Sequence, residues 1–239
     1  MQSRTSFSSR NVLPVLLLAM LVGSGTACMS SVTGGVDKVV VQADRSDPVR
    51  AAVADALAVA TQNFVPILGA PFNEEERAAM VEVQLGYSGV MSEMTSSMAG
   101  LRHAEHASES ARHVTVQMPG ATAKYWEQDI LMGNVSGTNK YVEWTFPVPF
   151  ADRHQVAMDL NARIAPLFAA DPKWHHTALN DKKLNPISAS WSYFLYLSMG
   201  MSGNSESIMV SVDYFHESAA YEANKGVLVY VSKISSSVK

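Results

Sequence analysis

The sequence predicts an α+β fold in which an antiparallel sheet carries its helices on one face. Segments rich in β-branched and aromatic residues follow one another with only turn residues between them, which favours antiparallel pairing. Two amphipathic stretches, each opened by an aspartate and interrupted near its end by a proline, predict two helices. The order of the segments is similar in the two halves, which indicates two β-α-β-β-β units at 38–120 and 138–239.

The first unit is expected to begin with a short strand at 38–41, which holds three consecutive valines. A helix should follow, because Asp47 is a favoured N-cap residue and Pro48 suits the first helical position. Apolar residues then recur at helical spacing as far as Phe64. Alternating valines predict two further strands, at Met80–Leu85 and His113–Met118.

The second unit is expected to repeat this order. It opens with a strand at Tyr141–Phe146, and Asp152 is the expected N-cap of a helix that ends near Pro166. Three further strands are predicted at Ala189–Ser198, Ser207–Phe215 and Gly226–Ile234. In the first of these, alternation places Trp191 and Tyr193 on one face and Tyr196 on the other.

Short local matches between the halves support a duplication. The segment Phe-Val-Pro-Ile-Leu at 64–68 resembles Ile-Ala-Pro-Leu-Phe at 164–168, and Gly-Tyr-Ser-Gly at 86–89 resembles Gly-Met-Ser-Gly at 200–203. Matches of this length also arise by chance, so one non-duplicated α+β domain is the alternative. If the duplication is real, the two units form either separate domains or one shared domain.

The N-terminus has the features of an export signal. Arg4 and Arg10 precede an apolar run at 12–22, which is too short for a membrane span of about 20 residues. Small residues follow, and Gly25-Thr26-Ala27-Cys28 resembles the lipobox of bacterial lipoproteins, although Gly25 stands where that family usually has Leu. The resemblance implies a signal peptide at 1–27 and acyl chains such as palmitate on Cys28. Ordinary secretion with a free thiol is the alternative.

Cys28 is the only cysteine, and its position favours lipidation. A disulfide framework needs an even number of cysteines, whereas the lipobox explains a single one beside the cleavage point. Several acyl chains would hold the protein on a membrane. Met29 follows, where an aspartate commonly marks inner-membrane retention, so the resemblance implies the outer membrane and its periplasmic face. Residues 28–37 read as the lipidated cysteine and a short flexible tether.

The charge of the mature chain argues against nucleic acid as a partner. Cleavage after residue 27 removes two of the 18 basic residues and none of the 22 acidic ones, which leaves a net formal charge of −6. No cluster of lysine and arginine stands out from the background. The lipid is therefore the expected link to the membrane, and a protein in the envelope is the expected partner.

Two groups of residues are candidates for metal ligands. His103 and His106 are three residues apart and would share a helix face, which suits chelation. Met91, Met94 and Met98 have helical spacing, and their thioethers could hold Cu(I). The simpler interpretations are a solvated segment for the histidines and a packed stripe for the methionines.

No catalytic motif is complete. Ser88 and Ser202 each lie in a Gly-x-Ser-Gly segment, where the second glycine comes one position too early for a nucleophile elbow. His175-His176 is expected in a loop, with adjacent side chains that point in different directions. The sequence has no phosphate-binding loop, zinc-protease motif or dinucleotide fingerprint, so we expect no cofactor.

We therefore expect a membrane-anchored periplasmic lipoprotein that is not an enzyme and acts as a protein-binding module. An envelope assembly factor and an inhibitor or immunity protein are both consistent with this layout. The first alternative is a metal or small-ligand carrier. The second alternative is a hydrolase with an unrecognised site.

Overall fold

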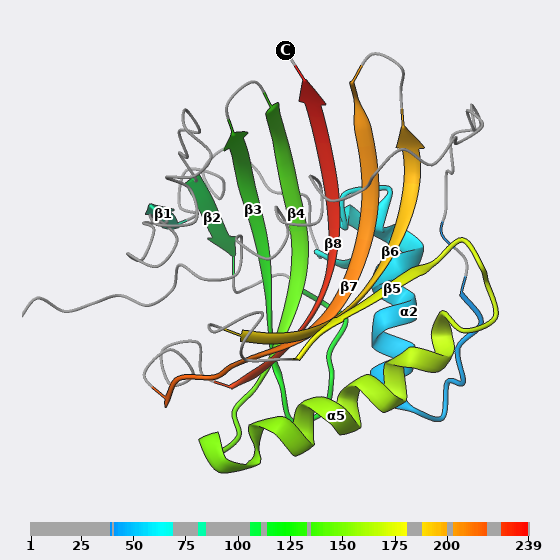
Figure 1. Cartoon of the computed structure of the whole chain (residues 1–239), viewed down its shortest axis with the longest axis vertical. Coiled ribbons are helices and arrows are strands. Elements are labelled where there is room, and N and C mark those ends of the chain that lie inside the picture. Colours follow the sequence, from blue (N-terminus) through cyan, green and yellow to red (C-terminus); the bar gives the residue numbers. More distant parts are fainter. Residues whose placement is uncertain are drawn as a thin grey trace, which may run out of the picture.

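Eight strands pair in one antiparallel sheet, in the order β1-β2-β3-β4-β8-β7-β6-β5 (Figure 1). The computed structural model describes residues 39, 41–68, 81–84, 106–110, 114–132, 135–180, 188–199, 203–218 and 226–238. The strands are β1 Val81–Gln84, β2 His106–Ser110, β3 Thr122–Met132, β4 Val135–Phe146, β5 His175–Leu179, β6 Ser188–Met199, β7 Ser205–Phe215 and β8 Val227–Val238.

Two helices cover one face of this sheet, which confirms the predicted fold class. They are α2 Pro48–Ala60 and α5 Arg153–Ile164, and they contact each other as well as the central strands (Figure 1). Short 3-10 helices flank them: η1 Val65–Ile67, η2 Phe150–Asp152 and η3 Ala165–Leu167. In the described part of the chain, neither helix is long and apolar enough to cross a membrane.

The two halves share an element order that differs from the predicted one. Within the described residues, each half has an α-helix that is followed by a 3-10 helix and four strands, and the second half has a further 3-10 helix, η2, before α5. The last strands of the two halves, β4 and β8, pair at the centre of the sheet. Val39 and Val41 lie outside the strands, so the predicted strand at 38–41 is wrong for these two residues; Lys38 and Val40 lie outside the described residues. Residues 121–137, which lie between the two predicted units, hold all of β3 and the start of β4. The matched segments at 64–68 and 164–168 contain η1 and η3.

The predicted strand at His113–Met118 is also wrong for residues 114–118. Val114 and Met118 are buried, but the backbone between them has a partner outside the sheet. The backbone N–H and the hydroxyl of Thr115 both donate to the carbonyl of Ile67, at 2.7 and 3.1 Å. The carbonyl of Val116 accepts the indole N–H of Trp144 at 3.0 Å. The alternating valines therefore mark an extended segment packed on the core, not a ladder strand.

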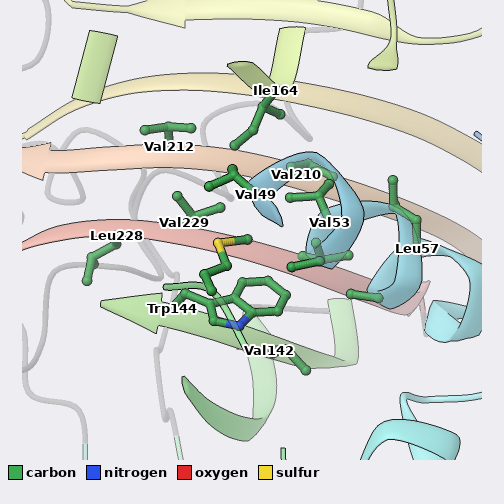
Figure 2. Close-up of a cluster of buried hydrophobic side chains, with 14 of the residues drawn as sticks. Val49, Val53, Leu57, Val142, Trp144, Ile164, Val210, Val212, Leu228 and Val229 are labelled. Carbon is green, nitrogen blue, oxygen red and sulfur yellow. The ribbon is translucent and has the colours of Figure 1, made fainter. Parts of the chain in front are cut away.

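The core lies between the helices and the central strands. Val142 on β4, Val231 on β8 and Val210 on β7 are successive Cα partners, so they form one row across the sheet. The next row on the same face is Trp144, Val229 and Val212. Figure 2 shows Val49, Val53 and Leu57 of α2 directed at these rows. Burial of side chains of this size contributes about 1.5–3 kcal/mol each.

Asp47 joins the two helices. Its carboxylate accepts the backbone N–H groups of Val49 and Arg50, at 2.9 and 3.3 Å, which caps α2 as predicted. Arg163, in the last turn of α5, donates to both carboxylate oxygens, at 3.0 and 2.7 Å. Arg50 in turn donates to the carbonyl of Arg163 at 2.6 Å. Asp152 stands at the N-cap position of α5, but its side chain makes no capping hydrogen bond.

Gly226 allows the chain to enter β8. Its φ is +135°, and a Cβ atom there would lie 1.9 Å from the carbonyl oxygen of Phe146. Only glycine permits both this backbone conformation and this approach. The residue therefore fixes the start of β8 against the end of β4.

We predict that Gly226→Ala destabilises the protein by about 3 kcal/mol or more, because steric overlap adds to backbone strain. The matched control is Gly120→Ala. Gly120 also has a positive φ, of +81°, but a Cβ there meets nothing within 4 Å. Gly120→Ala should lower the free energy of unfolding by only about 1 kcal/mol. Chemical unfolding measures the free energy of unfolding of both variants. Equal decreases in the two variants would contradict the role given to Gly226.

We predict that Asp47→Asn destabilises the protein by about 1–2 kcal/mol at neutral pH, since a cap and an ion pair are lost. The hydrogen bonds from Arg163 lower the pKa of Asp47 to about 2. A lowered pKa means that the stabilisation is present above the unfolded value near 4 and is lost as the pH falls through about 2. The unfolding free energies of the variant and the wild type should therefore converge in acid.

The control for this prediction is Arg45→Ala, which removes an exposed ion pair to Asp55 with a separation of 2.8 Å. Such a pair contributes at most about 1 kcal/mol. If Asp47→Asn lowers the free energy of unfolding by no more than Arg45→Ala does, the contacts of Asp47 do not stabilise the packing of the two helices.

Candidate functional site

Most residues predicted to carry chemistry lie outside the described residues. These are Cys28, Ser88, Met91, Met94, Met98, His103 and Ser202. His106 is the first residue of β2, where its Cα partners are Gln84 on β1 and Asp129 on β3. Metal binding by the histidines and methionines therefore stays a prediction. Within the described ranges, no three His, Cys, Asp or Glu residues are placed to hold a metal ion.

His175 and His176 lie in a strand, so their predicted placement in a loop is wrong. They begin β5, whose sequence His-His-Thr-Ala-Leu has one β-branched residue, Thr177, and none of the valine, isoleucine, phenylalanine, tyrosine or tryptophan residues that are typical of a buried strand. Their side chains do point in different directions, as predicted. His175 lies 5.7 Å from the ring of Tyr196, whereas His176 stacks on Tyr193 with ring centres 4.9 Å apart.

β5 forms one edge of the sheet and is exposed. Among the described strands it pairs only with β6, and the side chains of His175, His176 and Ala178 are exposed. Edge strands present unpaired backbone N–H and C=O groups, which can pair with another extended chain. Tyr196 on β6 is also exposed, at 38% of its surface. We refer to β5 with Tyr196 as the docking edge.

A stack of aromatic rings supports the docking edge from the helix side. Tyr193 lies between His176 and Phe168, with ring centres 4.9 and 4.5 Å away, and Phe168 contacts Trp174 at 4.5 Å. The hydroxyl of Tyr193 donates to Asn161 of α5 at 2.8 Å. Burial raises the pKa of Tyr193 to about 12, so the hydroxyl keeps its proton. These contacts fix the edge to α5.

The face of the sheet away from α2 and α5, here called the outer face, carries a buried polar cluster. Ser192, Ser211, Tyr230 and Glu143 are successive Cα partners on β6, β7, β8 and β4. Asp213 lies next to this row and is only 3% exposed. Its Cα partner on β6 is Ser190, which is fully buried and whose hydroxyl has no hydrogen-bond partner in the described structure.

Hydrogen bonds connect the cluster through Ser211. The hydroxyls of Ser192 and Ser211 are 2.9 Å apart, and Ser211 donates to Asp213 at 2.5 Å. The phenol of Tyr230 is also hydrogen-bonded to the Asp213 carboxyl. On β4, Thr145 donates to the carboxylate of Glu143 at 3.1 Å. Side-chain hydrogen bonds thus link β6, β7 and β8, while the bond between Thr145 and Glu143 lies within β4.

Burial raises the pKa of Asp213 to about 7, although the hydrogen bonds from Ser211 and Tyr230 act in the opposite direction. The nearby carboxylate of Glu143 adds to the increase. Burial also raises the pKa of Tyr230, and the adjacent Asp213 adds to this effect. Asp213 is therefore a buried acid that can change its charge near neutral pH.

Sequence reasoning missed Asp213, although a signal was present. In β7, Ile208, Val210, Val212 and Tyr214 alternate with Met209, Ser211, Asp213 and Phe215. Bulky residues on both faces indicate a strand that is covered on both sides, and a carboxylate in such a strand is rare. The placement of Trp191 and Tyr193 on one face and Tyr196 on the other was predicted and is confirmed.

No family model matches the chain, and no match was found among curated proteins or solved structures.

Proposed function

We propose that this chain is a lipid-anchored envelope protein that binds a protein partner along the docking edge. The observation that carries this proposal is the exposed position of β5 at the end of the sheet. Proteins with such an edge can bind an extended segment of a partner as an additional strand. In this mode, backbone hydrogen bonds supply affinity and the alternating side chains supply specificity.

The side chains around β5 suit this mode of binding. His175 and Tyr196 lie on one face of the edge, and His176 lies on the other with Tyr193 behind it. An added strand would place alternate side chains against these two groups. The rings behind His176 are held by α5, so little ordering would be needed on binding.

The envelope location follows from the lipobox resemblance at Cys28 and forms part of the proposal. A tether of about eight residues after the lipid spans at most about 28 Å. The docking edge would then work close to the membrane, on its periplasmic face. An envelope assembly factor and an inhibitor or immunity protein both fit a short tether with an exposed binding edge.

We predict that a proline in β5 abolishes partner capture without unfolding the protein. Successive residues of a strand direct their backbone N–H groups to opposite sides. One of the variants Thr177→Pro and Ala178→Pro therefore removes an N–H group that points away from the sheet, while the other removes a backbone hydrogen bond to β6. The tolerated variant is identified by its thermal midpoint. Captured partner, identified by mass spectrometry from cells that make the tagged full chain, should fall at least about tenfold for that variant.

The matched control is Met158→Ala, which truncates an exposed apolar side chain of α5 and leaves β5 and Tyr196 unchanged. It should leave capture unchanged. If the folded proline variant captures as much partner as the wild type, the docking edge is not the binding site. Capture that is also lost in Met158→Ala would point to α5 instead.

We also predict that Cys28→Ser releases the protein from the membrane, because the acylated thiol would be absent. Fractionation of cells that make each form measures the distribution. The variant should move to the soluble fraction, while the wild type stays with the membrane. A variant that remains membrane-bound would contradict lipid anchoring at this residue.

A further inference from the structure

The surroundings of Asp213 contain no described cation at ion-pair distance. Among the described residues, the titratable groups that act on Asp213 from other strands are Tyr230 on the adjacent β8 and Glu143 on β4, one strand beyond β8. Lys124 on β3 lies one strand further away, as the Cα partner of Glu143. On β6, the residue opposite Asp213 is Ser190, which does not titrate. Among the described residues, only hydrogen bonds would therefore stabilise the charge of Asp213 once it forms.

A continuous line of side chains leads from Asp213 to Trp126. Asp213 bonds to Tyr230, whose ring lies 6.0 Å from the ring of Tyr141 on β4. Tyr141 stacks on Trp126 of β3, with ring centres 6.1 Å apart and planes inclined by only 15°. These four residues span β7, β8, β4 and β3, which are adjacent in the sheet. A movement of Tyr230 would therefore be transmitted to Trp126 through ring contacts.

We propose that Asp213 is a proton-operated switch that controls the packing of the outer face. The neutral carboxyl accepts the hydrogen bonds of Ser211 and Tyr230 and stays buried. When it releases its proton to solvent, a negative charge remains in a poorly solvated site near the Glu143 carboxylate. The sheet around β7 and β8 then opens toward water, which moves Tyr230 and the rings beyond it. This inference is independent of the proposed docking edge.

The direction of the pH effect follows from the raised pKa. Asp213 titrates at about 7 in the folded chain and near 4 when unfolded. The neutral form therefore stabilises the fold fully below about pH 4, and this contribution is lost as the pH rises through about 7. Asparagine keeps the shape of the side chain and its acceptor oxygen but cannot ionise.

The test compares the full wild-type chain with Asp213→Asn from about pH 5 to about pH 9. We expect the thermal midpoint of the wild type to fall by several degrees over this range, and the difference from the variant to grow with pH. The emission of Trp126, one of four tryptophans, should change with pH in the wild type and not in Asp213→Asn. Comparison with Trp126→Phe identifies the part of the fluorescence emission that comes from Trp126.

Two serine variants keep the test valid if Asp213→Asn does not fold. Ser211→Ala removes a hydrogen bond that lowers the pKa of Asp213, so the transition should move to higher pH. Ser192→Ala deletes a hydroxyl in the same row that bonds to Ser211 and not to Asp213, so it should move the transition less. Parallel pH profiles for the wild type and Asp213→Asn, or an unchanged transition in Ser211→Ala, would overturn the proposal.

Discussion

β4 and β8 pair along their full lengths of 12 residues, and this ladder joins the two halves of the chain. Because side chains alternate along a strand, the register decides which residues meet the helices. In the observed register, Val142 and Trp144 face α2 and α5, while Tyr141 and Glu143 face the other way. A slip by one residue would bring Glu143 into the apolar core. Gly226 sets this register from one end of β8, where its backbone lies against Phe146.

The positions of the two proposed sites follow from this central pairing. The other described strands of each half lie outward from the centre, so the first described strand of each half, β1 or β5, is at an edge of the sheet. The docking edge is therefore a consequence of topology, and its first two residues, His175 and His176, are exposed. The polar cluster, by contrast, lies at the centre of the sheet, where β4, β8 and β7 are the most enclosed strands. It lies where water is least available to solvate a charge.

The sequence predicted those parts of the fold that depend on local patterns. Asp47-Pro48 identified the start of α2, and alternation of bulky residues identified β6, β7 and β8. It failed where tertiary contacts decide the structure. Residues 114–118 alternate like a strand, but Thr115 among them bonds to Ile67 outside the sheet. β5 pairs as a strand although His-His-Thr-Ala-Leu shows no alternation of apolar and polar residues. The alternation in β7 indicates that Asp213 is buried, but the hydrogen bonds and the Glu143 carboxylate that decide its pKa come from residues distant in the sequence.

The two faces of the central strands differ in a way that stability alone does not explain. On the helix face, rows of valine with Trp144 form an ordinary apolar core. On the outer face, the same strands bury Asp213 and Glu143 among serines and tyrosines. Replacing buried charged groups with well-packed apolar residues is often neutral or stabilising, so a fold under selection for stability alone would not need them. A carboxyl that is neutral at low pH and charged at high pH can give the sheet two states that differ in packing. An apolar residue at the same position has no charge to change and cannot provide these two states.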